Sequence, residues 1–201
     1  MKLYFAPATC SLSPHIVLQE LKLPYDLVRV DNRTKRTSEL SDFLSINPKG
    51  YVPALALESD RLLTESQVIL LYVADQAPAS ALMPASGTFE RYESMEWLAW
   101  TSTELHKRFS PIFVPGASSE AKEAAWAALA APLTYLAGQI GDDGYLVGDD
   151  FTVADAYLFT VLNWVGFTSF SLDHWPALQA YQARIKMLPA VQEALRQEGL
   201  Q

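Results

Sequence analysis

The sequence has little cysteine, a deficit of positive charge and no long hydrophobic run, and each shortage excludes a class of protein. Cys10 is the single cysteine among 201 residues, so no intramolecular disulfide can form, which suits a reducing compartment. The 15 basic and 23 acidic residues leave a net charge of −8, which argues against nucleic acid as a partner. The most apolar stretch, residues 154–170, is interrupted by polar side chains and falls short of the ~18 apolar residues of a membrane span. The first apolar run stops at Pro7, too early for a signal peptide, so we expect a cytoplasmic protein without a membrane partner.

Half of the residues are apolar, which is enough for a sizeable core, and the first part of the chain alternates between strand and helix patterns. Residues 2–5 and 26–30 have the composition of strands, and a helical pattern over residues 12–23 connects them as a βαβ unit. After a charged segment, residues 29–39, three further elements follow: strands over 52–57 and 61–63, and an apolar helix over 65–76. Because the turn Glu58-Ser59-Asp60 would join those two strands as a hairpin, the sheet should be mixed.

The second part of the chain is predicted to be helical throughout. A segment rich in proline and small residues, 78–87, reads as a linker, and strand patterns become scarce beyond it. Helical patterns then cover residues 89–109, 119–140, 152–166, 175–187 and 190–198. Thr152 and Asp155 have the spacing of a capping box, which we interpret as a helix start only. The expected organisation is α/β followed by all-α: one domain over 1–77, the linker, and a helical domain over 88–201.

Cys10 follows the first predicted strand and stands at the start of the first predicted helix. A free cysteine is often just a small buried side chain. At a turn between a strand and a helix, however, burial alone does not explain why the residue is a cysteine. A helix N-terminus favours the thiolate by ~0.3 to 2 kcal/mol, which could move the pKa of a thiol from ~8.5 to about 7. The Ser11 and Ser13 hydroxyls, or a histidine brought in by the fold, could add to that effect. Because no second cysteine is available, any disulfide at Cys10 must involve another molecule, such as a small thiol.

Two other segments allow both a structural and a functional interpretation. A cis Val52-Pro53 bond would free the Val52 backbone to pair with an extended peptide, but spacing alone favours an ordinary proline at a strand start. Thr64-Glu65-Ser66-Gln67 has the form of a capping box. Alternatively, the N–H groups there and the Ser66 hydroxyl could bind a carboxylate while Glu65 accepts an ammonium, which together suit an amino-acid head group.

A small and polar stripe marks the first long helix of the second part. Ala99, Thr103, His106 and Ser110 fall on one side of that helix, beside apolar residues. Such a stripe indicates that the helix borders a cleft. A core histidine bonded to a hydroxyl is the alternative for His106.

Taken in order, these segments resemble the cytosolic glutathione transferases. The resemblance is carried by Ala-Thr-Cys-Ser, Asn-Pro-Lys-Gly-Tyr-Val-Pro-Ala-Leu, Leu-Thr-Glu-Ser, Thr-Glu-Leu-His and Phe-Thr-Val-Ala-Asp-Ala-Tyr, spread over essentially the whole chain. The cysteine points to the bacterial Beta class. The family implies a thioredoxin-like domain with a mixed sheet, a C-terminal helical bundle, a homodimer, glutathione as co-substrate, and no metal.

The resemblance also assigns roles to individual residues. Cys10 matches the cysteine that contacts the glutathione sulfur, and His106 matches the histidine that approaches the same sulfur, which makes these two the expected catalytic residues. The expected glutathione contacts are Cys10, Ser11, Lys35, Val52, Glu65, Ser66, Thr103 and His106. Lys35 would reach the glycyl end, although it could equally be one charge of an exposed basic run. Ala99 departs from the asparagine that is common at this position in the class, so the affinity for glutathione or the choice of second substrate should differ.

We therefore expect a glutathione transferase that directs the glutathione thiol at small hydrophobic electrophiles, with additional glutathione-dependent redox activity through Cys10. Three alternatives stay open: a glutathione-dependent thiol-disulfide oxidoreductase with Cys10 as nucleophile, a dicarboxylate isomerase, and a non-catalytic interaction module of the same fold. The isomerase is disfavoured because the first helix offers only His15 as a cation. The presence of Cys10, Glu65, Ser66 and His106 argues against the interaction module.

Overall fold

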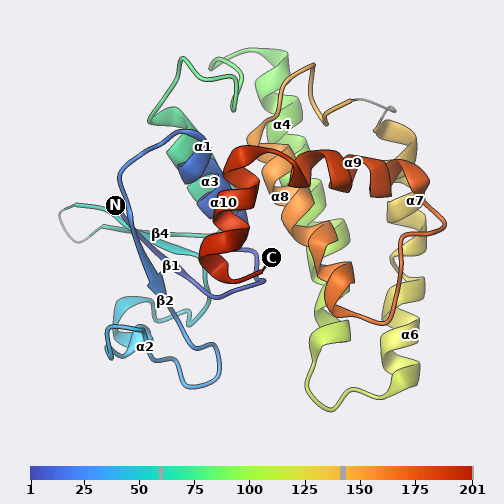
Figure 1. Cartoon of the computed structure of the whole chain (residues 1–201), viewed down its shortest axis with the longest axis horizontal. Coiled ribbons are helices and arrows are strands. Elements are labelled where there is room, and N and C mark those ends of the chain that lie inside the picture. The colour runs from blue at the N-terminus through green and yellow to red at the C-terminus, as the bar shows by residue number, and fades with distance from the viewer. Residues whose placement is uncertain (59–60, 141–143, 201) are drawn as a thin grey trace. The chain divides into compact units, whose positions relative to one another are not determined.

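The computed structural model describes residues 1–58, 61–140 and 144–200 of the chain (Figure 1). It divides into two compact units, one formed by residues 1–83 together with 187–201 and the other by residues 84–186. The predicted turn falls partly outside the described residues, because Ser59 and Asp60 are not among them.

The first unit contains a mixed sheet, as the sequence predicts. Among the described residues its strands are β1 (Lys2–Phe5), β2 (Asp26–Arg29), β3 (Ala54–Ala56) and β4 (Leu62–Thr64), in the order β2-β1-β3-β4. β1 pairs in parallel with β2, as expected for a βαβ unit, and antiparallel with β3. β3 and β4 pair antiparallel as the two arms of the predicted hairpin.

Helices cover both faces of this sheet. α1 (Leu12–Glu20) and α3 (Ser66–Asp75) lie together on one face, and the short α2 (Phe43–Ile46) lies on the other (Figure 1). α2 was not predicted from the sequence. It begins because the carboxylate of Asp42 accepts the backbone N–H of Leu44 at 3.1 Å, a typical N-cap contact.

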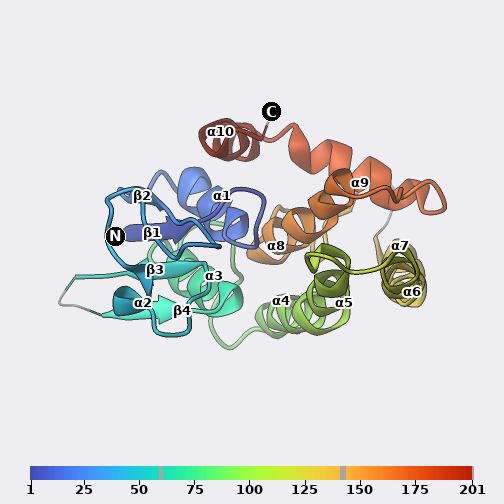
Figure 2. The same ribbon diagram turned by 90° about the horizontal axis from the view of Figure 1, so that it is seen from below.

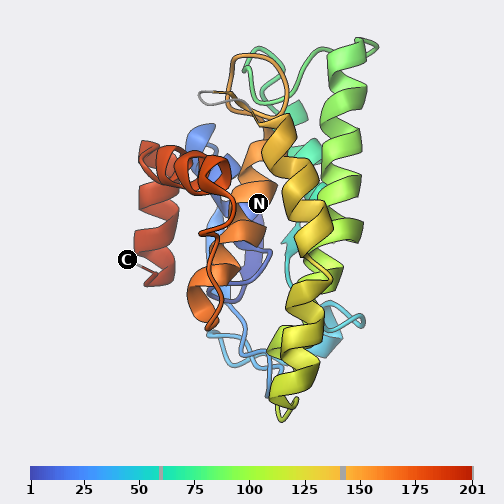
Figure 3. The same ribbon diagram turned by 90° about the vertical axis from the view of Figure 1, so that its right-hand side faces the viewer.

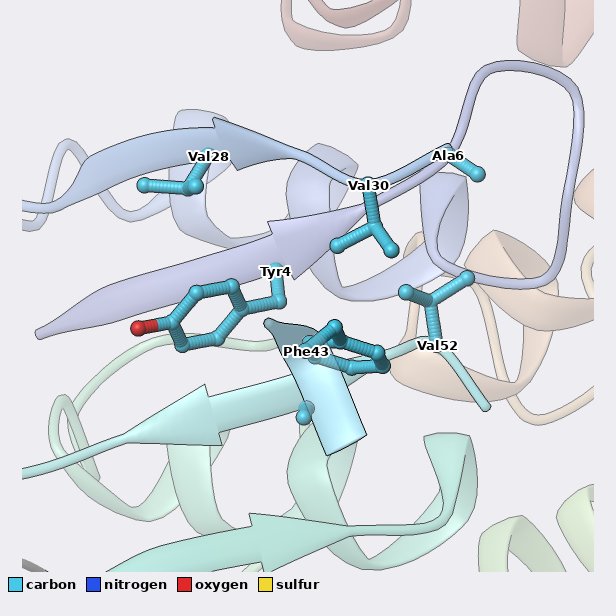
Figure 4. Packing of buried hydrophobic residues seen from close by; sticks show 7 residues of the cluster. Tyr4, Ala6, Val28, Val30, Phe43 and Val52 are labelled. Atoms are coloured by element: carbon cyan, nitrogen blue, oxygen red, sulfur yellow. The ribbon is translucent and has the colours of Figure 1, made fainter. Parts of the chain in front are cut away.

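The α2 face of the sheet is closed by a small apolar cluster around one aromatic ring. Phe43 is fully buried, and its ring centroid lies 5.6 Å from that of Tyr4 on β1. Figure 4 shows Phe43 pointing from α2 toward the strands; the cluster comprises Tyr4, Ala6, Val28, Val30, Phe43, Val52 and Ala54. Val52 and Ala6 therefore link this core directly to the two loops that precede β3 and follow β1.

The last helix, α10 (Pro189–Glu198), packs against α1 and thus belongs to the first unit. The sequence assigned this segment to the helical domain, so the expected limits of 1–77 and 88–201 differ from the observed units chiefly in α10. Its apolar side carries the buried Val191, Ala194 and Leu195. At its end the buried His15 of α1 bonds the Glu198 carboxylate through Nδ1 at 2.9 Å and the Gln197 amide oxygen through Nε2 at 3.0 Å. Both ring nitrogens of His15 are therefore used in holding α10.

The second unit is helical, but its helices are more broken than the sequence predicts. The expected helix over 89–109 consists of α4 (Phe89–Trp100), a π-helix η1 (Thr101–His106) and α5 (Lys107–Phe109), followed by a 3-10 segment η2 (Ser110–Phe113). The expected helix over 119–140 is two helices, α6 (Ser119–Ala127) and α7 (Ala130–Gln139). α4 and α7 lie side by side in Figure 3, and the rings of Trp97 and Tyr135 stack between them with centroids 6.3 Å apart.

α8 (Val153–Leu162) lies in the middle of the second unit, between α4 and α9 (Pro176–Lys186) in Figure 2, and all of its residues are buried. The predicted capping box starts it: the Asp155 carboxylate accepts the backbone N–H of Thr152 at 2.9 Å and its hydroxyl at 2.8 Å. The same carboxylate accepts the Leu146 N–H at 3.0 Å and the Tyr181 hydroxyl at 2.8 Å. This buried carboxylate thus joins α8 to α9 and to the preceding loop. At its C-terminal end α8 continues into a 3-10 segment, η3 (Asn163–Phe167).

None of the helices in residues 1–58, 61–140 and 144–200 combines the length and the apolar character that crossing a membrane requires.

Candidate active site

The loop between β1 and α1 is fixed by a buried hydroxyl. The Ser11 side chain is fully buried, and its Oγ accepts the Ala6 N–H at 3.2 Å, lies 2.8 Å from the Thr9 hydroxyl and 3.1 Å from the Ala6 carbonyl oxygen. These contacts occupy the hydroxyl, so its side chain serves the loop that presents the neighbouring Cys10. A role of Ser11 in contacting glutathione remains a prediction.

Cys10 lies directly before the N-cap residue of α1 rather than in the first turn of the helix. Its side chain is partly buried, and Sγ donates to the carbonyl oxygen of Val52 at 3.5 Å. The Val52-Pro53 peptide bond is cis, against the ordinary trans bond that spacing alone favoured. The fold thus brings together two predicted site residues that are 42 positions apart in the sequence.

The thiol of Cys10 is harder to ionise than the sequence led us to expect. Burial raises its pKa to about 11, because the thiolate loses its hydration. The Ser66 hydroxyl and the Cys10 backbone act in the opposite direction and lower the pKa, while the negative charge of Glu65 raises it further. The expected lowering toward 7 by a helix N-terminus was therefore wrong: desolvation outweighs the favourable polar contacts.

Glu65 and Ser66 stand at the start of α3, where the sequence placed a head-group site. α3 begins at Ser66 with Glu65 as its N-cap residue, and no side chain caps it, so the capping box predicted at Thr64 is not formed. Glu65 has a positive φ of 69°, a strained conformation for a non-glycine residue, and its exposed carboxylate accepts from the Lys49 ammonium at 2.9 Å. Ser66 is buried beside Cys10. The start of α3 thus offers uncapped N–H groups, a hydroxyl and a carboxylate in one place.

Lys35 is held by the segment that precedes the cis bond. Its ammonium donates to the Gly50 carbonyl at 2.8 Å and lies 5.7 Å from the centroid of the Tyr51 ring. Gly50 has φ +70°, and a Cβ there would meet the Leu44 side chain at 3.0 Å, so glycine suits this turn on both counts. Lys35 is therefore a positioned cation rather than one more member of a freely solvated run.

In the second unit, His106 ends the π-helix η1. Its Nδ1 lies 2.8 Å from the Tyr157 hydroxyl, and its ring packs edge-on to Trp164 with centroids 4.7 Å apart. Burial, with a smaller contribution from the charge of Lys107, lowers the pKa of His106 to about 4, so the ring is neutral at pH 7. The alternative of a histidine bonded to a hydroxyl is thus what the structure shows, yet the ring is only partly buried.

Thr103 and Ala99 belong to the exposed side of this helix, as the predicted stripe requires. The Thr103 hydroxyl donates to the Ala99 carbonyl at 3.2 Å. The stripe does not lie on a regular α-helix, because the π-helix η1 has wider turns between Thr103 and His106.

Sequence reasoning missed three side chains that shape these groups: Lys49 beside Glu65, and Tyr157 and Trp164 around His106. Lys49 was present in the Asn-Pro-Lys-Gly motif but was given no role. Tyr157 and Trp164 carry no local signal, since their contacts with His106 span 50 or more positions of the chain. Among the described residues, no group of three or more His, Cys, Asp or Glu side chains could hold a metal ion.

A four-stranded mixed sheet with a cysteine after β1 and a cis-proline before β3, joined to a helical unit, defines the thioredoxin-like architecture of the glutathione transferases. Family models for the N-terminal and C-terminal domains of glutathione S-transferase match residues 9–76 and 100–189. The chain is 41% identical over 200 residues to glutathione S-transferase GstA of Escherichia coli O157:H7, with both chains covered completely. It therefore belongs to the glutathione S-transferase family.

Solved structures of glutathione S-transferases also match this chain. A Beta-class glutathione S-transferase of Sphingomonas chungbukensis matches with a TM-score of 0.95 at 45% identity, and a sphingomonad glutathione S-transferase complexed with glutathione matches with 0.94 at 44%. Each match covers the whole of both chains. The expected fold class and the resemblance to the Beta class are thus confirmed.

The raised pKa of Cys10 predicts slow alkylation of the free protein at neutral pH. With a pKa of about 11 the thiolate fraction at pH 7 is roughly 300-fold below that of an ordinary cysteine with a pKa of ~8.5, and the rate should rise about tenfold per pH unit up to pH ~10. Iodoacetamide labelling followed by mass spectrometry measures this without interference, since the chain has a single cysteine. The unfolded protein is the control and should titrate near ~8.5. A midpoint below 9 in the folded protein would contradict the assignment.

Proposed function

We propose that this transferase binds glutathione on its first unit and conjugates the glutathione thiol to small hydrophobic electrophiles. The observation that carries the proposal is the convergence of three predicted site residues: the Cys10 thiol 3.5 Å from the Val52 carbonyl, with Ser66 beside it at the start of α3. A thiol, an extended backbone segment and a helix N-terminus are the three features that a cysteine-containing tripeptide with an amino-acid head group needs.

In this proposal each charged end of glutathione meets groups of opposite charge or polarity on the protein. The γ-glutamyl carboxylate binds the Ser66 hydroxyl and the N–H groups of α3, and its ammonium binds Glu65, whose carboxylate Lys49 already orients. The Val52 backbone pairs with the cysteinyl part. Lys35 meets the glycyl carboxylate, which supplies a local positive charge against the overall charge of −8.

The protonation states favour conjugation over the alternative of a thiol-disulfide oxidoreductase. A Cys10 thiol with a pKa of about 11 is a poor nucleophile at pH 7 but can donate its S–H to the glutathione sulfur. His106, neutral at this pH, acts in the proposal as a second donor to that sulfur. Hydrogen bonds from both groups stabilise the glutathione thiolate, which then attacks the electrophile. Exchange through a mixed disulfide at Cys10 is proposed as a slower second activity.

The surroundings of His106 indicate an aromatic or otherwise apolar electrophile. Trp164 packs on the imidazole, and the half-exposed Phe113 lies 6.2 Å from Trp164, centroid to centroid. The exposed part of the Phe113 ring offers apolar surface near the proposed catalytic histidine, while Trp164, only 7% exposed, packs behind it. We place the enzyme in the cytoplasm, where its single cysteine stays reduced.

Substitution of the head-group and glycyl contacts should weaken glutathione binding without unfolding the protein. We expect the Kd for glutathione to rise about tenfold or more in Ser66→Ala and in Lys35→Ala, because each removes a hydrogen bond to a charged group worth ~1.5 to 3 kcal/mol. Isothermal titration calorimetry measures both, with Lys186→Ala, an exposed lysine outside the site, as the matched control. Unchanged affinity in both variants would refute the proposed site.

Activity assays and mass spectrometry of Cys10→Ala separate conjugation from disulfide exchange. That variant should keep part of the conjugation of a generic aromatic electrophile, through the remaining donor His106, and should form no mixed disulfide with oxidised glutathione. Loss of conjugation with intact glutathione binding would instead favour the oxidoreductase.

We further propose that the enzyme is a homodimer. α4 exposes Phe89, Tyr92 and Met95 at helical spacing, with 72%, 61% and 39% of each residue accessible, and the first unit exposes Tyr51 by 75%. Large apolar side chains gathered on one side of a helix indicate a protein interface.

Light scattering coupled to size exclusion should therefore report twice the chain mass, and Tyr92→Glu should shift the enzyme toward monomer because a charge would be buried. Met187→Glu changes an equally exposed apolar residue on another segment and should leave the dimer intact. A monomeric wild-type protein at micromolar concentration would exclude the proposal.

A further inference from the structure

The buried hydroxyl of Tyr157 makes a direct contact with the proposed catalytic histidine. Tyr157 lies on α8, is 2% exposed, and places its hydroxyl oxygen 2.8 Å from His106 Nδ1. Every residue of α8 is buried, and its start is held by four hydrogen bonds to Asp155. The phenol therefore comes from the most firmly packed helix of the second unit.

A second side chain from the same region fixes the plane of the imidazole. Trp164, in the η3 segment that continues α8, meets the His106 ring at 80° with centroids 4.7 Å apart. His106 itself ends the π-helix η1, so its backbone lies at a change of helix geometry. The orientation of the ring thus depends on contacts from α8 and η3 rather than on its own helix.

The two ring nitrogens of His106 have different environments. Nδ1 bonds Tyr157, whereas within the described part of the chain Nε2 has no hydrogen-bond partner, and the residue is only partly buried. A neutral imidazole has one N–H donor and one acceptor nitrogen. If the Tyr157 hydroxyl donates to Nδ1, the proton of the ring must sit on Nε2.

We propose that Tyr157 is a positioning residue that donates its hydroxyl proton to Nδ1 of His106 and thereby presents Nε2–H as the donor at the reacting sulfur. This inference rests on the proposed function of His106. Without the phenolic hydroxyl, the ring can flip about its Cβ–Cγ bond and can place its proton on either nitrogen. Part of the population then offers an acceptor, or no donor, to the glutathione thiolate.

Tyr157→Phe tests the proposal because it removes one oxygen and keeps the ring that packs beside His106. The 15N NMR shifts of the imidazole nitrogens should show a single Nε2–H tautomer in the wild type and a mixture in the variant. The kcat of conjugation should fall about tenfold, as expected for the loss of one hydrogen bond, with the KM for glutathione unchanged.

A double-mutant cycle shows whether Tyr157 acts through His106. Tyr157→Phe should cause no further loss of kcat in a His106→Ala background. Tyr181→Phe is the matched control, since it removes another buried hydroxyl that bonds a side chain, here Asp155 at 2.8 Å. It should leave the His106 tautomer unchanged, and thermal unfolding of all variants reports any loss of stability.

The outcomes distinguish a failure of the role of Tyr157 from a failure of the role of His106. An unchanged tautomer in Tyr157→Phe, or an equal loss of kcat with and without His106, would overturn the positioning role. If His106→Ala instead retains full activity, the proposed catalytic role of His106 fails, while the NMR result still decides whether Tyr157 sets its tautomer.

Discussion

Desolvation of two ionisable side chains is the constraint on which the proposed chemistry depends. Cys10 and His106 are both removed from water sufficiently that each favours its uncharged form, the thiol by a pKa raised to about 11 and the imidazole by one lowered to about 4. Neither is accompanied by an opposite charge strong enough to reverse this effect. Each is therefore a neutral hydrogen-bond donor at pH 7, which suits the proposed stabilisation of a glutathione thiolate better than the formation of a thiolate on the protein.

Buried polar contacts within each unit hold these two side chains in place. On the first unit, the buried Ser11 hydroxyl holds the loop that carries Cys10, and α1 behind it is secured to α10 by the bonds of His15 to Glu198 and Gln197. In the second unit, the Asp155 carboxylate fixes the start of α8, the helix from which Tyr157 reaches His106. In both cases a buried polar group helps to fix where a side chain of the proposed site lies.

Local sequence patterns predicted the features whose cause is local. The strand at residues 2–5, the βαβ unit, the mixed sheet and the capping box at Thr152 follow from composition and spacing, and the ordered motifs identified the family. Features that depend on distant segments could not be predicted. Cys10 contacts Val52, and Ser66 and Glu65 influence its pKa, all from more than 40 positions away; α10 joins the first unit through its contacts with α1, and the Tyr157 contact crosses 51 positions. The π-helix at 101–106 also lacked a signal, because its residues fit a regular helical pattern equally well.

The central claim is that the reacting thiolate belongs to glutathione and not to Cys10. The most direct test is the ultraviolet difference spectrum of the thiolate, recorded against pH for the protein with and without glutathione, in the wild type and in Cys10→Ala. The account predicts a thiolate that appears only with glutathione, ionises below the ~8.5 of an ordinary cysteine thiol, and persists in Cys10→Ala. A thiolate that forms at neutral pH without glutathione, and that disappears in Cys10→Ala, would contradict it.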